Sequence, residues 1–167
     1  GNGQEEHNLC VKVSEQLKTA LTKSGHKVTV LDFPTLNNTD DLNRTIKAAN
    51  ALKGVDFGIS LHMDAFTNPN AKGGHVCHYP VTSSKRIATA IADSLTGYMT
   101  GRASKIVARR DLAILKRTVA PWVLIELGFI TSKVDIKKLM DNPKTSQNEL
   151  QPLIDVLVKG INKAAKL

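Results

Sequence analysis

The stretch Phe57–Ala65, with the sequence FGISLHMDA, carries the clearest structural pattern of this chain. In it, an apolar run with β-branched character ends in a histidine, and polar loop residues follow. The pattern predicts a buried strand over residues 55–62 of an α/β sheet. His62 then lies at the carboxyl end of the strand, where open α/β sheets bind their ligands.

A second stretch, Trp122–Ile130 (WVLIELGFI), has the same form and predicts a strand over residues 122–126. Here Glu126 interrupts an otherwise apolar run. A carboxylate in a buried strand is costly unless it is paired, protonated or bound to a metal. A lone histidine at a strand end is typical of a structural residue, but two parallel strands would bring His62 and Glu126 into one cleft. The pair therefore indicates a functional site.

Apolar spacing along the rest of the chain predicts helices that alternate with strands. The expected helices span residues 5–24, 39–53, 83–100, 132–140 and 147–165, and the expected strands span 27–33, 55–62, 75–79, 105–108, 112–115 and 122–126. This order predicts a single α/β domain over residues 1–167, with a mostly parallel (mixed), twisted sheet flanked by helices on both faces. Because the chain opens with a helix, we expect the sheet to lack a leading strand.

The composition is that of an ordinary globular domain. The 167 residues are 41% hydrophobic and 23% charged, and no apolar run is long enough to cross a bilayer. The net charge of +8 favours anionic partners such as nucleic acid, anionic lipid or an anionic wall polymer. Because the lysines are scattered and aromatic residues are only 4%, a solvated basic surface is favoured over a nucleic-acid-binding one. Cys10 and Cys77 form no motif, and we expect buried thiols.

The residues that could bind a metal are dispersed along the chain. The candidates are Glu5, Glu6, His7, His26, His62, His75, His78 and Glu126. They form neither an HExxH motif nor a tight Cys/His cluster, so spacing alone does not predict zinc. A zinc site built from residues that are far apart in the sequence stays open.

Four segments carry a resemblance to a known family. Residues 1–6 (GNGQEE) match Gly-Asn-Gly-x-x-Glu at the start of a first helix, and residues 60–65 (SLHMDA) are close to Ser-x-His-x-Asn-Ala. Residues 121–132 (PWVLIELGFITS) resemble Pro-x-x-Leu-x-Glu-x-Gly-Phe-x-(Ser/Thr)-Asn, and Gly73-Gly74 precedes a short strand. By these motifs the chain resembles the zinc-dependent N-acetylmuramoyl-L-alanine amidases, the type 3 amidases of bacterial cell-wall hydrolases and phage endolysins.

The resemblance implies a role for three residues. Glu6 and His62 match two zinc ligands of the family, and Glu126 matches its catalytic glutamate. The implied reaction is hydrolysis of the amide between N-acetylmuramic acid and the L-alanine of the stem peptide. In it, zinc polarises the amide carbonyl and lowers the pKa of a bound water. Glu126 takes the proton of that water and passes it to the leaving amine. Apolar surroundings should raise the pKa of Glu126 toward working pH.

The resemblance also implies a setting. The substrate is peptidoglycan, which is cleaved in cell-wall lysis or remodelling, and the enzyme acts outside the cell or leaves the cytoplasm through a holin. Residues 1–20 are polar and then amphipathic, so we expect no signal peptide. No nucleic acid, no membrane span and a monomeric state are expected.

The chain departs from the family pattern at the third zinc ligand. In the family, a strand ending in His-Gly-Gly precedes the Gly-Asn-Gly segment and supplies a further zinc histidine, which would lie upstream of Gly1. The sequence is then part of a longer protein, or the domain is catalytically weak, or His7 or His78 substitutes. A milder departure is Asp64, where the family usually has asparagine. An inactive peptidoglycan-binding or regulatory module is therefore the alternative to an amidase.

Overall fold

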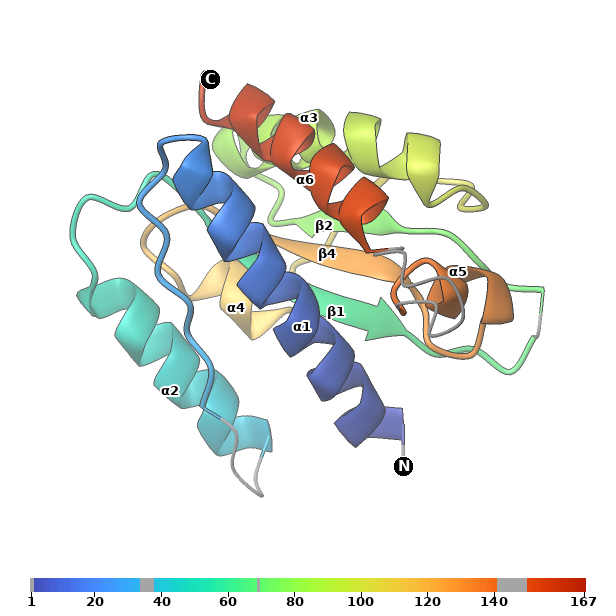
Figure 1. Cartoon of the computed structure of the whole chain (residues 1–167). Helices are drawn as coiled ribbons and strands as arrows, with labels where there is room; N and C mark the ends of the chain where they lie inside the picture. Colours follow the sequence, from blue (N-terminus) through green and yellow to red (C-terminus); the bar gives the residue numbers. More distant parts are fainter. Residues whose placement is uncertain (1, 34–37, 69, 141–149) are drawn as a thin grey trace.

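A mixed four-stranded sheet forms the centre of the computed structural model, which describes residues 2–33, 38–68, 70–140 and 150–167 (Figure 1). Its strands are β1 (Gly58–Asp64), β2 (His75–His78), β3 (Ile106–Ala108) and β4 (Trp122–Phe129). The strand order is β1-β4-β2-β3. β1 runs parallel to β4, and β2 runs antiparallel to β4 but parallel to β3. The expected α/β domain with a mixed sheet is confirmed.

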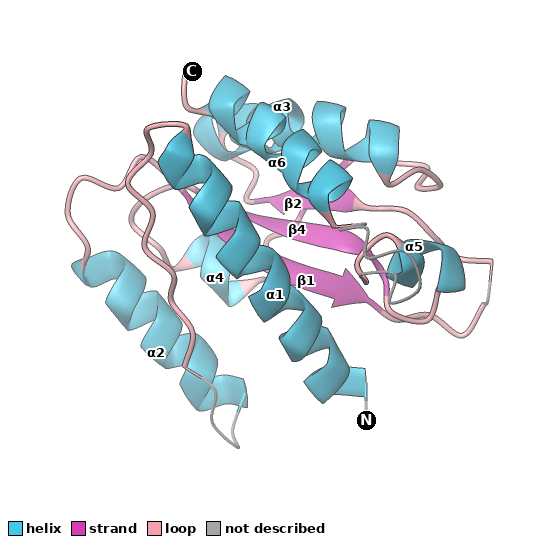
Figure 2. Cartoon of the chain, viewed as in Figure 1, coloured by secondary structure: helices cyan, strands magenta, loops and turns pink. Residues whose placement is uncertain are grey.

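Helices cover both faces of this sheet (Figure 2). The larger layer contains α1 (Asn2–Lys23), α3 (Thr82–Tyr98) and α6 (Gln151–Ala164), and the smaller contains α2 (Asn38–Ala51) and the short α4 (Ala113–Lys116). A further short helix, α5 (Lys133–Lys137), follows β4. No helix in the described ranges is long and apolar enough to span a membrane.

Alternation along β4 divides the apolar residues between two cores. Val123, Ile125 and Leu127 belong to the core beneath α1, α3 and α6, whereas Trp122 and Leu124 belong to the core beneath α2 and α4. Successive side chains of a strand point to opposite faces, so Glu126 shares the second face with Leu124. The Glu126 carboxylate thus lies on this face next to Leu124, at the edge of the smaller core.

Two of the expected strands are wrong. Residues 27–33 are not a strand: no backbone hydrogen bond between described residues joins them to the sheet, although Val28 and Leu31 pack against its two cores. Residues 112–115 give the helix α4 rather than a strand, because a four-residue apolar run fits one helical turn as well as a short strand.

The other expected elements are found with shifted ends. β4 continues past the expected residue 126 to Phe129, and β1 runs to Asp64 rather than to His62. The last helix begins at Gln151, and the first part of its expected range, residues 147–149, lies outside the described residues. Cys77 is a buried free thiol as expected, whereas Cys10 is also free but only half-buried.

Candidate active site

A row of polar side chains crosses the sheet at the carboxyl ends of β1 and β4. His62 of β1 is in register with Glu126 of β4, and Glu126 is in register with His75 of β2. Residues paired across neighbouring strands project from the same face of a sheet. His62, Glu126 and His75 therefore lie side by side, with the glutamate in the middle.

Glu6 comes to this row from helix α1. Val13, Leu17 and Leu21 bury one stripe of α1 against the sheet, and this packing brings the N-terminal turns of the helix to the end of β1 (Figure 1). Glu6 Oε1 lies 3.2 Å from His62 Nδ1 and accepts a hydrogen bond from the backbone N–H of Met63, also at 3.2 Å. On the other side of the imidazole ring, His62 Nε2 lies 3.1 Å from Ser60 Oγ.

The environment of Glu126 favours its protonated form. Burial raises the pKa of this carboxyl, and the nearby negative charge of Asp64 raises it further. His62 and Arg102 act in the opposite direction, and the resulting pKa is about 7. Glu126 Oε2 is buried and has no hydrogen-bond partner among the described residues. The expected rise in pKa is confirmed, and burial is its main cause.

The two groups in contact, Glu6 and His62, stabilise each other's charged form. Burial alone would raise the pKa of Glu6, but the hydrogen bonds from His62 and from the Met63 backbone lower it overall. Burial alone would lower the pKa of His62, but the hydrogen bond to Glu6 and the charge of Glu126 raise it overall. The site therefore gathers negative charge around one imidazole.

Arg102 holds together the loops beside this row. Its guanidinium forms an ion pair with Asp64, donates from Nε to the carbonyl of Gly73 at 3.0 Å, and lies 4.0 Å from the centre of the Phe129 ring. Asp135, which is buried, accepts hydrogen bonds from the backbone N–H groups of Gly73 and Phe129 at 2.8 and 2.9 Å. Sequence reasoning missed Arg102. The charge of Asp64, at a position where the resemblance implies an asparagine, was the available signal.

The proposed substitutes for a third zinc ligand lie away from the site. His7 faces Asp32, with 3.8 Å between Nε2 and Oδ2. His78 is in register with Val123, three residues before Glu126 on β4, and its Nδ1 lies 2.7 Å from the Tyr79 carbonyl oxygen. Because β2 runs antiparallel to β4, it is His75 rather than His78 that lies beside Glu126. Within the described ranges, no group of three His, Cys, Asp or Glu residues could hold a metal.

Comparison with known proteins identifies the family. A model of the N-acetylmuramoyl-L-alanine amidases matches residues 1–154. The chain belongs to this amidase family.

Relatives and a solved structure agree. An uncharacterised cell wall amidase of Bacillus anthracis is 32% identical over 129 residues, which are 72% of this chain and 24% of that protein. The amidase LytC of Bacillus subtilis is 28% identical over 147 residues, which are 83% of this chain and 28% of LytC. The chain thus spans about a quarter of the length of these two relatives. The catalytic domain of the CD27L endolysin, which targets Clostridia difficile, superposes with a TM-score of 0.78 at 28% identity, covering 94% of this chain and 83% of that one.

Proposed function

We propose that this amidase-family domain hydrolyses the bond between N-acetylmuramic acid and L-alanine in peptidoglycan, with zinc held by Glu6 and His62 and with Glu126 as general base and acid. The observation that carries the proposal is the contact between Glu6 and His62, made beside the half-buried Glu126, whose buried Oε2 has no hydrogen-bond partner among the described residues. Three residues that are far apart in the sequence converge on this one end of the sheet.

The donor atoms fit a zinc ion. Two ligands on tetrahedral zinc, each about 2.0–2.1 Å from the metal, lie about 3.3 Å from each other. Glu6 Oε1 and His62 Nδ1 lie 3.2 Å apart, and a carboxylate oxygen with an imidazole nitrogen is a usual zinc donor pair. With Nδ1 as the metal ligand, the ring proton would be on Nε2, which would donate a hydrogen bond to Ser60 Oγ. This hydrogen bond would fix the orientation of the His62 ring. The resemblance implies a third zinc ligand, a histidine upstream of Gly1, and we include this ligand in the proposal.

The residues of this chain then divide the chemistry between them. Bound zinc supplies a Lewis acid for the amide carbonyl and lowers the pKa of water. Glu126 accepts the proton of the attacking water and delivers it to the nitrogen of L-alanine as the amide bond breaks. Burial, which raises the pKa of this carboxyl above its ordinary value, suits both steps because it brings proton uptake and release closer to neutral pH.

The test is to incubate the protein with purified peptidoglycan and to identify the group that is released. We expect new L-alanine amino termini, and we expect a zinc chelator to abolish them and added zinc to restore them. The metal content of the natural protein should be one zinc per chain.

Other products would contradict the proposal. New reducing sugars would indicate a glycosidase, and new amino termini of other residues would indicate an endopeptidase. Binding to peptidoglycan without any new amino termini and without stoichiometric zinc would favour the alternative, an inactive binding or regulatory module.

A further inference from the structure

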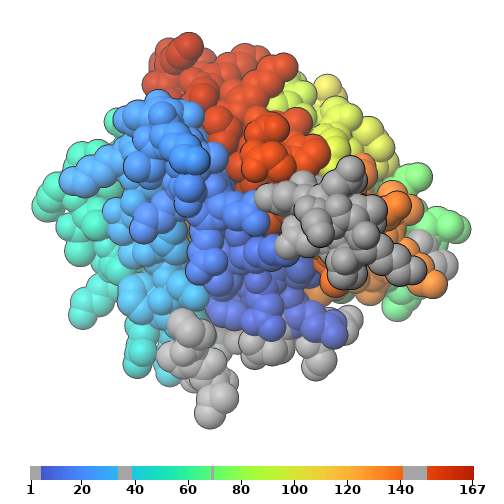
Figure 3. Space-filling model, viewed as in Figure 1, coloured from blue at the N-terminus to red at the C-terminus, as the bar shows by residue number. Residues whose placement is uncertain are grey.

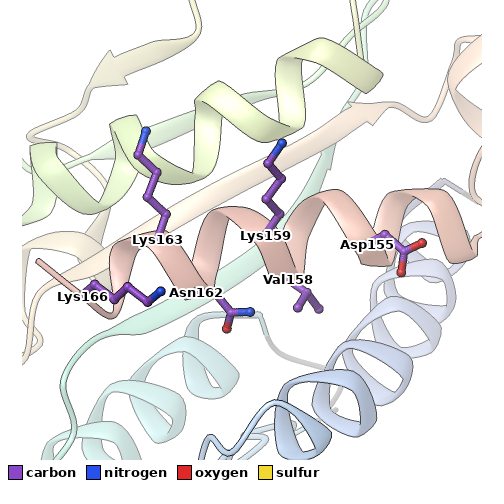
Figure 4. Close-up of a pocket in the computed structure, with 6 residues that line it drawn as sticks. All are labelled: Asp155, Val158, Lys159, Asn162, Lys163 and Lys166. Atoms are coloured by element: carbon purple, nitrogen blue, oxygen red, sulfur yellow. The ribbon is translucent and has the colours of Figure 1, made fainter.

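A basic groove runs along the outer face of helix α6. Its cavity of about 510 Å³ is lined by Asp155, Val158, Lys159, Asn162, Lys163 and Lys166 (Figure 4). Lys159 and Lys163 stand one turn apart on α6, and Lys166 follows two residues after the last helical residue, Ala164. All three lysines are exposed. We propose that this groove binds a linear phosphodiester polymer carried by peptidoglycan.

The lysines of the groove are poorly neutralised. Lys163 has an acidic partner, Asp93, with 3.4 Å between Nζ and Oδ2. Across the described part of the chain, neither Lys159 nor Lys166 has an ion-pair partner. Like charges one turn apart destabilise a helix slightly. The charges of Lys159 and Lys166 are therefore available to an anionic ligand.

Neighbouring elements extend the positive charge. His26 Nε2 lies 2.6 Å from Asn162 Oδ1, so the turn that follows α1 lies against the groove, with Lys23 and Lys27 exposed on either side of that histidine. The space-filling view shows the surface of α6 next to that of α1 and the segment after it (Figure 3). Arg86 of α3 donates from Nη2 to the carbonyl of Leu167 at 3.4 Å and adds a further cation near the end of α6.

The shape and chemistry of the groove favour a chain of anions over other ligands. Lys159 and Lys163 stand about 6 Å apart along the helix axis and Lys166 follows beyond the helix end, and such a spread of cations suits repeating phosphates better than a single ion. Lysine ammonium groups are point charges without the fork that arginine offers to one phosphate, so they suit non-specific contacts along a polymer. None of the six described residues that line the groove carries an aromatic ring on which nucleic-acid bases could stack. The choice of a wall polymer over nucleic acid rests on the proposed function.

The basic groove is well separated from the active site. Lys23 and Glu6 stand at opposite ends of α1, and their separation of 17 positions corresponds to about 25 Å along the helix. A polymer bound at one end of the molecule would therefore hold the domain on the wall and leave the active site free for a glycan strand.

The test compares two triple variants that remove equal charge. The first changes Lys159, Lys163 and Lys166 to Gln. The control changes Lys47, Lys53 and Lys116 to Gln, which are exposed lysines in or next to the α2/α4 layer on the other face of the sheet. Binding of labelled inorganic polyphosphate is measured over a range of salt concentrations, and retention is measured on purified walls before and after chemical removal of their phosphodiester polymers.

We expect the groove variant to have a slope of log affinity against log salt that is flatter by about 2. Each lysine–phosphate contact contributes about 0.7 to this slope, and the variant removes three lysines. It should also lose the retention that depends on wall phosphodiesters, whereas the control variant should keep both. Equal losses in the two variants, or equal retention on stripped walls, would overturn the proposal. Tighter binding of single-stranded DNA than of polyphosphate would also overturn it, in favour of nucleic acid. Hydrolysis of a soluble muramoyl peptide is measured in a separate assay that does not depend on binding to the wall. Failure of the proposed enzymatic function is therefore distinguished from failure of the proposed binding.

Discussion

The two ends of helix α1 face opposite charge environments. At its N-terminal end, Glu6 meets His62 beside Glu126 and Asp64, where the groups are partly buried and each one shifts the pKa of its neighbours. At the other end, the lysines of the basic groove are exposed to solvent. Charge that is shielded from water acts strongly and only through its partners, whereas exposed charge acts weakly and additively. Mutations should therefore have large, coupled effects at the first end and small, independent effects at the second.

The largest effect is expected from Glu126→Gln. The amide has nearly the same shape but cannot accept a proton from water, so turnover of a muramoyl peptide should fall about 10²–10⁴-fold. Zinc content should not change, because Glu126 is not a proposed ligand. Glu5→Gln, which removes an exposed carboxylate one residue before Glu6, is the matched control and should keep full activity. Wild-type turnover in Glu126→Gln would assign the proton transfer to another group.

The ligand pair should show the next largest effect. Replacing Glu6 or His62 by Ala removes one zinc ligand. Loss of a residue that only supports a ligand typically lowers metal affinity by roughly 10–100-fold, so loss of a ligand itself should lower zinc affinity by more than that. Ser60→Ala removes only the supporting contact to His62 Nε2 and should lie within that range. Competition with a chelator measures all three variants. Equal affinity in Ser60→Ala and His62→Ala would show that His62 is not a ligand.

Much of the fold could be predicted from the sequence, because its signals are local. The apolar runs that carry His62 and Glu126 form neighbouring parallel strands, as their pattern predicts. The two errors have a common cause. Residues 27–33 and 112–115 have strand-like composition, but strand formation needs a neighbouring strand to pair with, and sequence composition does not provide that information.

The candidate site was only partly predictable. Motif resemblance singled out Glu6, His62 and Glu126, and the structure brings them together. Arg102 and His75 reach the site through tertiary packing: Arg102 crosses from the loop after α3 to Asp64, and His75 depends on the antiparallel direction of β2. Neither residue belongs to a local motif, so the sequence could name His75 only as one of eight dispersed metal candidates, and Arg102 is revealed by the fold alone.

Coupling between Asp64 and Arg102 gives the third prediction. Arg102→Met leaves a partly buried carboxylate without its cation and removes the hydrogen bond to Gly73, so unfolding free energy should fall by roughly 2–4 kcal/mol. Asp64→Asn in the same chain should recover part of this loss, because the uncompensated charge is gone. Urea denaturation of the two single variants and of the double variant measures the coupling. Simple additivity would show that the ion pair does not link the two loops.

The pH dependence of stability gives the fourth prediction. Glu126 has a pKa of about 7 in the folded protein, above the ordinary value of 4.5, so the folded state binds its proton more tightly than the unfolded state does. Its favourable contribution is complete below pH 4.5 and is lost as the pH rises to about 7. His62, whose pKa is also raised, acts in the same direction. Metal-free wild type should therefore lose roughly 1–2 kcal/mol more than Glu126→Gln between pH 5 and pH 8. Parallel pH curves would show that burial does not perturb this carboxyl.

The smallest effect is expected at the basic groove. Asp93 and Lys163 form an exposed ion pair, so Asp93→Asn should change the unfolding free energy by less than about 1 kcal/mol, and salt should reduce even that difference. The same substitution removes the acidic partner of Lys163 and should strengthen polyphosphate binding. A large loss of stability in Asp93→Asn would show that the charges near the groove depend on their partners as strongly as the charges beside Glu6 do. The proposed contrast between the two ends of α1 would then be wrong.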